Sequence, residues 1–258
     1  FILNGTEVSA AAGETIWQTA HRLGVEIPHL CYRRAADYKG DGNCRACLVE
    51  IEGERALAPS CIREPEEGMV VTSNSERAKK TRAAVFELLL ADQSEPEGEF
   101  KIWLDQMSIT DSRFPKNRSV EADTSHTAID VDLNKCIHCK LCVQACRDIQ
   151  GNDVIGMAMR GSESAIVFDM ADPMGASSCV GCGECVQVCP TGALKSSALD
   201  ATSGTLEADK TVDSVCPYCG VGCQVRFHVK DNKIVQVEGR DGPANHGRLC
   251  VKGRFGMD

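Results

Sequence analysis

The feature that most constrains this chain is its cysteine content, because sixteen cysteines divide into four groups of four with none left over. In chain order the groups are Cys31, Cys44, Cys47 and Cys61; Cys136, Cys139, Cys142 and Cys146; Cys179, Cys182, Cys185 and Cys189; and Cys216, Cys219, Cys223 and Cys250. An iron–sulfur cluster is held by four thiolates, and a CxxCxxCxxxC run supplies several of them from one tight loop. The pattern therefore predicts four iron–sulfur clusters and a protein that transfers single electrons.

Disulfides and zinc are the two other uses of so many cysteines. A disulfide framework is typical of short secreted domains, whereas this chain has 258 residues and opens on a strand-like segment without an apolar signal region. Structural zinc sites more often include histidine or two separate CxxC pairs, so zinc stays an alternative for a single site rather than for all four. Because clusters require reduced thiols, we expect a reducing compartment, the cytoplasm.

Charge and hydrophobicity argue against two classes of partner. The net charge is −9 and no basic stripe is present, so we expect no nucleic acid. The longest apolar stretch, residues 83–91, is interrupted by Glu87 and is too short to cross a bilayer, so we expect no membrane partner. Aromatic residues make up only 5% of the chain, which predicts several small modules that depend on their metal for stability.

Residues 1–91 are predicted to form the first domain, a 2Fe-2S domain with a trailing helix. The Asn4–Gly5 pair is a strong hairpin signal between two strand-like segments. The apolar spacing from Ile16 to Leu23 predicts a helix, and Gly24 suits its left-handed end. Residues 46–51 read as a strand that follows a glycine-containing cysteine loop, whose backbone is free to wrap a cluster.

The helix that ends this domain is expected to have one apolar face. Its predicted members are Ala78, Val85, Leu88 and Leu89. Ser75 suits the N-cap of this helix. Prolines, glycine and many charges then predict a linker over residues 92–129, with scattered apolar residues that contact a neighbouring part of the protein.

Residues 130–205 carry two CxxCxxCxxxC runs, an arrangement typical of a two-cluster bacterial ferredoxin. In such domains the fourth cysteine of each run ligates the other cluster. The first site is therefore assigned to Cys136, Cys139, Cys142 and Cys189, and the second to Cys179, Cys182, Cys185 and Cys146. Pro190 follows its run as the motif expects, whereas Arg147 stands at the matching position of the other run. Between the runs, residues 154–159 and 165–168 read as a small extra hairpin.

Residues 206–258 form the last predicted domain and carry the CPYCGVGC motif at residues 216–223. Alternating apolar residues predict strands over 225–229 and 234–237, with a turn at Asp231–Asn232 between them. The fourth cysteine of this group, Cys250, arrives only after that hairpin.

Three histidines invite a ligand hypothesis, although each quartet is complete without them. His29 precedes the first cysteine by two positions and is expected to be a loop residue. His138 is expected to tune a cluster potential or to be exposed, and His126 to face solvent in a loop.

Two of these motifs resemble specific families. The CRAC motif at residues 44–47, followed by LVEIEG, resembles the 2Fe-2S domain of complex I large subunits, hydrogenases and NAD-linked formate dehydrogenases, which implies a β-grasp fold. CPYCGVGC with GRLCVKGRFG at residues 247–256 resembles the 4Fe-4S domain of molybdenum and tungsten bis-pyranopterin oxidoreductases, formate dehydrogenases above all. In that family the lysine matching Lys252 lies between cluster and pterin and assists electron transfer. The alternative is an exposed lysine on a basic tail with Arg248 and Arg254.

In their order, the modules resemble the electron-relay part of the alpha subunit of a cytosolic NAD-dependent formate dehydrogenase. The implied fold class is α+β: a β-grasp 2Fe-2S domain, a two-cluster ferredoxin domain, and a small β-rich 4Fe-4S domain that opens a catalytic region outside this chain. The implied cofactors are one 2Fe-2S and three 4Fe-4S clusters, with molybdenum or tungsten bis-pyranopterin guanine dinucleotide in the full subunit. The implied partners are the remainder of that catalytic subunit and a flavin-containing NADH-dehydrogenase-type beta subunit.

The resemblance implies that electrons from formate oxidation pass along four clusters to the flavin subunit that reduces NAD, with CO2 reduction as the reverse. The chain alone would hold no catalytic residue. Residues 92–115 contain neither histidine nor cysteine, so the extra 4Fe-4S cluster found in complex I relatives is not expected. Two alternatives stay open: a stand-alone electron-transfer protein, and the relay subunit of a hydrogenase or complex I-like NADH dehydrogenase.

Overall fold

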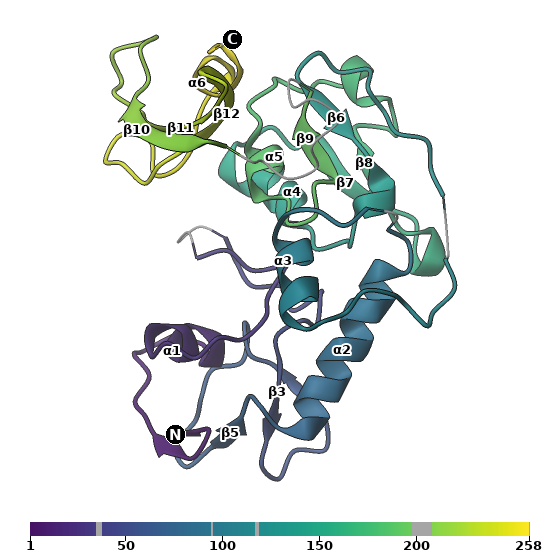
Figure 1. Ribbon diagram of the computed structural model, residues 1–258, viewed down its shortest axis with the longest axis vertical. Coiled ribbons are helices and arrows are strands. Elements are labelled where there is room, and N and C mark those ends of the chain that lie inside the picture. The colour runs from purple at the N-terminus through teal and green to yellow at the C-terminus, as the bar shows by residue number, and fades with distance from the viewer. Residues whose placement is uncertain (35–37, 94, 117–118, 198–207, 258) are drawn as a thin grey trace. The chain divides into compact units, whose positions relative to one another are not determined.

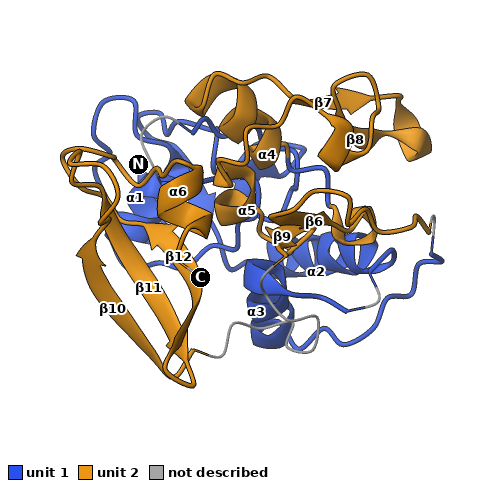
Figure 2. Cartoon of the chain, turned by 90° about the horizontal axis from the view of Figure 1, so that it is seen from above, with its two compact units in different colours: residues 1–118, 137–139 blue, residues 119–136, 140–258 orange. Residues whose placement is uncertain are grey.

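The computed structural model describes residues 1–34, 38–93, 95–116, 119–197 and 208–257. The chain divides into two compact units, residues 1–118 with 137–139 and residues 119–136 with 140–258 (Figure 2). Both units mix short strands with helices, as the α+β prediction requires. The predicted domain boundary between residues 205 and 206 lies outside the described residues.

Unit 1 contains a five-stranded sheet in the order β2-β1-β5-β3-β4. Its strands are β1 (Ile2–Leu3), β2 (Thr6–Glu7), β3 (Leu48–Ile51), β4 (Ala58–Pro59) and β5 (Val70–Thr72). The predicted hairpin is confirmed, because β1 pairs antiparallel with β2 across Asn4 and Gly5, which both have positive φ. β1 also pairs in parallel with β5, with Leu3 opposite Val71. Residues 2 and 3 are therefore held within the sheet.

The helix α1 (Ile16–Arg22) begins at a capping box. The Thr15 side chain accepts a hydrogen bond from the Gln18 backbone N–H at 3.2 Å, and the Gln18 side chain accepts one from the Thr15 N–H at 2.8 Å. The predicted end is confirmed, since Gly24 has φ +75°. Leu23 is the C-cap residue and is 45% exposed, so it lies outside the apolar face.

The helix α2 (Glu76–Leu90) runs beside β3 (Figure 1). Ser75 is its N-cap, as predicted, and its side chain accepts from the Ala78 N–H at 3.1 Å. The predicted apolar face is confirmed at Ala78, which is fully buried, and is wrong at Leu88, which is 52% exposed. The buried residues recur instead every four positions: Ala78, Arg82, Phe86 and Leu90. The sequence did not predict this buried stripe because one of its members is an arginine, a residue type that is normally expected to face solvent.

The segment predicted as a linker contains a helix, α3 (Gly98–Gln106). Phe100 and Leu104 are buried, and the ring of Phe100 stacks on that of Phe86 with centroids 5.7 Å apart. The predicted contact of apolar residues in this segment with a neighbouring part of the protein is confirmed. The helix was not predicted, because the prolines, the glycine and the charges outweighed the apolar spacing of four residues.

In unit 2, residues 129–196 form two small antiparallel sheets with short helices between them. The strands are β6 (Ile129–Val131) paired with β9 (Leu194–Ser196), and β7 (Ile155–Ala158) paired with β8 (Ala165–Phe168). The helical segments are η1 (Leu133–Lys135), α4 (Leu141–Gln144), the π-turn η2 (Ala145–Ile149), η3 (Gly161–Glu163), η4 (Met174–Ala176) and α5 (Glu184–Val188). The hairpin predicted between the two cysteine runs is confirmed.

The last part of unit 2 is a three-stranded meander, β10 (Lys210–Val215), β11 (Gln224–Lys230) and β12 (Lys233–Gly239), followed by α6 (Val251–Phe255). The predicted turn is confirmed, because Asp231 and Asn232 join β11 to β12 with φ of +49° and +59°. Val225, Val237 and Leu249 form the buried core of this part.

All sixteen cysteines lie within the described residues, and all are free thiols. The disulfide alternative therefore does not apply to this fold. No helix among the described residues combines the length and the apolarity needed to span a membrane.

Candidate metal centres

Hydrogen bonds connect the sulfurs of the first quartet. Contacts with Cys44 and Cys61 lower the pKa of the Cys31 thiol, and these contacts raise the pKa of both partners. A hydrogen bond with Cys61 also lowers the pKa of Cys47. All four side chains are buried, the most accessible being Cys44 at 4%. The four sulfurs thus form one connected group in which some thiols favour the thiolate, the form that binds iron.

The loop around this quartet approaches the sulfurs closely. A Cβ at Gly40 would lie 2.6 Å from the carbonyl oxygen of Cys61, so only glycine fits. The backbone N–H of Ala46 donates to Sγ of Cys44 at 3.5 Å. Such N–H···S hydrogen bonds support cluster sulfurs and adjust reduction potentials, so the residues present fit a bound cluster.

Arg82 is a buried cation beside this site that the sequence analysis missed. It is 8% exposed, and its guanidinium donates to the carbonyl oxygens of Leu48 at 3.1 Å and Ser73 at 2.7 Å. Burial lowers the pKa of Arg82, while the negative charge of Cys47 raises it. The signal that could have found Arg82 is its place in the four-residue stripe of α2.

His29 lies in a loop, as predicted, and packs against aromatic rings. Its ring centroid lies 4.4 Å from that of Trp17 and 6.1 Å from that of Trp103. Burial lowers the pKa of His29, which favours the neutral imidazole. The other two histidines are half-buried: His126 accepts a hydrogen bond from the Ala128 N–H at 3.1 Å, and His138 has φ +54°.

In unit 2, Cys146 lies with the run Cys179–Cys185, which is the grouping that ligand crossing predicts. Burial raises the pKa of the Cys185 thiol, and the charges of Cys182, Cys179 and Cys146 raise it further. Two backbone N–H groups donate to sulfurs of this group, Val154 to Cys146 at 3.3 Å and Gly181 to Cys179 at 3.4 Å. These donors fit a cluster in the same way as the donor in the first quartet.

The other predicted ferredoxin site is partly assembled in one core. Cys136, Cys142 and Cys189 belong to the apolar cluster that also contains Cys146 and Cys185. Cys139 is buried, but it lies in the short segment 137–139 that is grouped with unit 1. This ligand set therefore stays a prediction.

The fourth quartet is the most accessible. Burial raises the pKa of Cys223, with further contributions from Cys216, Cys219 and Cys250, so the four thiols share one electrostatic environment. Cys219 and Cys250 are exposed, and the other two are half-buried. The Cys216 N–H donates to the Cys223 carbonyl at 2.8 Å, which closes the CPYCGVGC loop.

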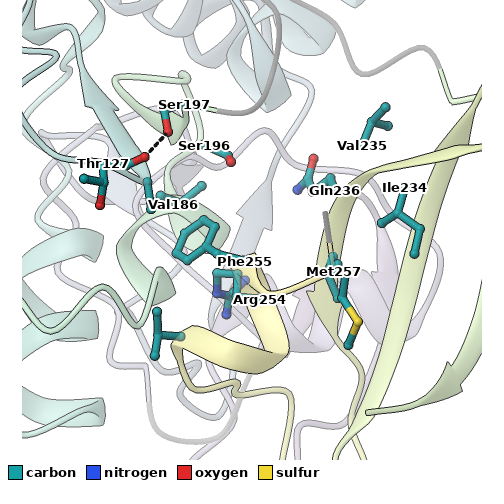
Figure 3. A pocket seen from close by; sticks show the side chains of 13 residues that line it. Thr127, Val186, Ser196, Ser197, Ile234, Val235, Gln236, Arg254, Phe255 and Met257 are labelled. Carbon is teal, nitrogen blue, oxygen red and sulfur yellow. Dashed lines mark hydrogen bonds between the residues drawn. The ribbon is translucent and has the colours of Figure 1, made fainter. Parts of the chain in front are cut away.

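Lys252 and Arg254 lie on the same short helix and differ in burial. Lys252 is exposed, and its role stays a prediction. Arg254 is only 6% exposed, so the alternative of an exposed basic tail is wrong for this residue. Arg254 and Phe255 of α6 and Val186 of α5 line the same cavity (Figure 3).

Among the described residues, no three Cys, His, Asp or Glu side chains converge closely enough for a single metal ion. The first quartet shares hydrogen bonds between its sulfurs, and the third and fourth share charge. Backbone N–H donors to sulfur, which iron–sulfur clusters use, are present at Cys44, Cys146 and Cys179.

Three family models match the chain in succession. They are a 2Fe-2S iron-sulfur cluster binding domain over residues 1–76, a 4Fe-4S dicluster domain over residues 135–193, and a molybdopterin oxidoreductase Fe4S4 domain over residues 209–258. This order confirms the predicted fold class.

Curated relatives resemble nearly the whole chain. An NADH-quinone oxidoreductase subunit of Rhizobium meliloti is 34% identical over 96% of this chain and 30% of its own length. The NADPH-Fe(3+) oxidoreductase subunit alpha of Geobacter sulfurreducens is 31% identical over 98% of the chain and 30% of its own length. A subunit of the NADP-reducing hydrogenase of Solidesulfovibrio fructosivorans is 32% identical over 74% of the chain and 35% of its own length. The chain thus spans about a third of the relatives it matches.

A solved structure shares the fold. An NAD+-reducing NiFe-hydrogenase in its H2-reduced state superposes with a TM-score of 0.70 at 26% identity, over 78% of this chain and 88% of the hydrogenase chain. The relatives named here belong to NAD(P)H-linked oxidoreductases and hydrogenases, and this chain is similar to part of them.

Proposed function

We propose that this chain, an iron–sulfur segment similar to those of NADH-quinone oxidoreductase subunits, is the electron relay of an NAD(P)H-linked oxidoreductase complex. The observation that carries the proposal is the succession of three iron–sulfur domain types along one chain. When bound, the clusters supply one-electron carriers, and the cysteines of this chain hold them at successive positions.

The ligand sets belong to this proposal. They are Cys31, Cys44, Cys47 and Cys61 for a 2Fe-2S cluster, and three 4Fe-4S sets: Cys136, Cys139, Cys142 and Cys189; Cys146, Cys179, Cys182 and Cys185; and Cys216, Cys219, Cys223 and Cys250. Hydrogen bonds among the sulfurs support the first set, and charges shared among the cysteines support the third and fourth sets. Backbone N–H donors to sulfur supply further support in the first and third.

As the finer assignment we propose that the electron donor is formate, oxidised at a molybdenum or tungsten centre in the remainder of the subunit. Support comes from the molybdopterin oxidoreductase match over residues 209–258 and from the CVKGRFG motif that contains Lys252. Lys252 is the proposed electron-transfer residue, and its exposure on α6 leaves it accessible to a neighbouring domain. A flavin subunit that reduces NAD is the proposed partner, and the cytoplasm, where thiols stay reduced, the proposed location.

A second candidate is the relay subunit of an NADH-quinone oxidoreductase or of a hydrogenase. It is favoured by the names of the relatives, which include an NADH-quinone oxidoreductase subunit and an NADP-reducing hydrogenase subunit. Against it stands the absence of histidine and cysteine from residues 92–115.

The test is purification of the native complex that contains this chain, with metal analysis, EPR of the reduced protein and activity assays. We expect one 2Fe-2S and three 4Fe-4S signals from this segment, about fourteen irons. Formate-dependent NAD+ reduction with molybdenum or tungsten present would support the finer assignment. A complex without either metal that oxidises hydrogen, or that passes electrons from NADH to quinone, would replace it with the second candidate. About eight irons would mean that only the ferredoxin pair was assigned correctly.

A further inference from the structure

A buried polar network joins the domain of residues 209–258 to the domain of residues 135–193. Arg254, on α6, donates to the carbonyl oxygen of Cys182 at 2.9 Å, to Oε1 of Gln187 at 2.7 Å and to Oε2 of Glu184 at 3.3 Å. The side chains of Arg254 and Glu184 are each only 4% exposed. One guanidinium from the last domain is thus shared among three acceptors on a single cysteine loop and helix of the other.

Gln187 extends the network back into the last domain. Its Nε2 donates to the carbonyl oxygen of Gly247 at 3.1 Å, and its Oε1 accepts from the Gly239 N–H at 3.1 Å. Gly247 lies three residues before Cys250, and Cys182 and Cys250 belong to different proposed cluster sites. The network therefore connects the backbone beside one ligand to the backbone beside another.

Apolar packing alone does not set the register of this junction. A cavity of about 300 Å³ opens between the two domains, and apolar residues such as Val186, Ile234 and Phe255 line it together with polar ones, Arg254 included (Figure 3). Apolar surfaces that leave such a space tolerate sliding, because hydrophobic contact has no direction. The hydrogen bonds from a planar guanidinium are directional, so three acceptors can all be reached only when the two domains lie in one arrangement.

Gly183 shows how closely Arg254 fits. Gly183 has φ +70°, and a Cβ there would clash with Cδ of Arg254 and lie 2.7 Å from Cζ of Phe255. The cysteine loop and α6 are in contact at this point, and a single methyl group would separate them.

From these contacts we infer that Arg254 is a positioning residue that locks the 209–258 domain onto the Cys179–Cys185 loop and so fixes the separation of two adjacent cluster sites. The inference rests on the proposed relay function, in which electrons must cross this junction. An ion pair is expensive to bury, and a role in fixing register is one reason to retain it.

The experiment compares R254Q, R254K and G183A in the full protein with R226Q as the matched control. Arg226 lies on β11 of the same domain and pairs with Asp213 at 2.8 Å, but it is 44% exposed. Hydrogen exchange reports on the network itself, at the Gly239 N–H and over residues 247–255. EPR of the fully reduced protein reports the magnetic interaction between the two clusters, which depends on their separation.

We expect the Gly239 N–H to exchange about tenfold faster in R254Q and in G183A, as follows from loss of hydrogen bonds to a charged group. The inter-cluster splitting is expected to narrow in the same variants while each 4Fe-4S signal is retained. R254K keeps the charge but cannot serve three acceptors, so an intermediate result is expected. R226Q should match the wild type in both measurements.

Wild-type exchange and wild-type splitting in both R254Q and G183A would overturn the inference. Uniformly faster hydrogen exchange across the domain, with the inter-cluster splitting unchanged, would mean that Arg254 only stabilises the domain. That result would also overturn the inference. The proposed function fails separately, through an iron content of the wild type far from about fourteen, and in that case the exchange comparison still tests the network because only protein atoms take part.

Discussion

The first and last cysteine quartets are built in opposite ways. Cys31 and Cys47 are completely buried in a domain whose core joins α1, four strands and the cysteine loop itself. Cys219 and Cys250 are exposed, and the buried core beneath their domain consists of three described residues, Val225, Val237 and Leu249. We expect hydrophobic burial to hold the first site, whereas the last, with its small core, should depend on its ligands for order.

The largest effect that this comparison predicts follows removal of iron. When iron is chelated under reducing conditions, amides of β10–β12 should lose at least about a hundredfold of their protection from hydrogen exchange, because little buried apolar surface holds that domain together. Amides of β3 and β5 should stay protected, since their core does not need the cluster. Equal loss of protection in the two regions would contradict the proposed difference.

The next effect tests the core of the first domain through Trp17. This side chain is 3% exposed, and its Nε1 donates to the Ile27 carbonyl at 2.9 Å. Trp17→Ala should destabilise the domain by about 3–5 kcal/mol, measured as faster exchange of the β3 amides. Trp17→Phe, which keeps much of the ring volume, should cost clearly less. A cost of Trp17→Ala below about 1 kcal/mol would show that burial does not hold the first site.

A smaller effect is expected at Arg82. Arg82→Met leaves the carbonyl oxygens of Leu48 and Ser73 without their buried donor, so we expect a loss of about 1–3 kcal/mol in the same exchange measurement. The control is Arg77→Met on the same helix. Arg77 pairs with Glu50 but is 48% exposed, so the change should cost less than about 0.5 kcal/mol. Equal costs would mean that burial of Arg82 contributes nothing.

The smallest effect is pH-dependent. A hydrogen bond from Arg22 lowers the pKa of Glu14 from an ordinary value of 4.5 to about 2. Because the folded pKa is depressed, the stabilisation is complete above pH 4.5 and is lost as the pH falls toward about 2. In Arg22→Gln the Glu14 carboxyl should titrate closer to its ordinary value in a carbon-13 NMR titration. The stability cost at neutral pH should be small, because the Arg22 side chain is 48% exposed and solvent screens the pair. An unchanged Glu14 titration would exclude Arg22 as the cause.

Local signals in the sequence predicted local structure well. The Asn4–Gly5 hairpin, the Ser75 cap and the Asp231–Asn232 turn all occur where the chain chemistry indicates, because each depends on residues within a few positions of one another. The helix α3 was not predicted, because its apolar residues lie among charges and follow a proline.

The burial of charged residues could not be predicted from such local signals. The sequence did not single out Arg82, and it offered an exposed basic tail as the alternative for Arg254. Both side chains are buried. Their partners come from elsewhere in the sequence: Leu48 and Ser73 for the first, and Cys182, Glu184 and Gln187 for the second. A buried guanidinium is stable only where such acceptors gather, and no local pattern announces that.

The sequence by itself determined the four cysteine quartets, the order of the three domains and most turns and caps, because these are set by residue type and short spacing. Only the tertiary structure decided that the first quartet is buried while the last is partly exposed, and that Arg254 joins two domains. The physical reason is that burial and charge compensation depend on which distant segments meet, and those meetings are a property of the packed chain.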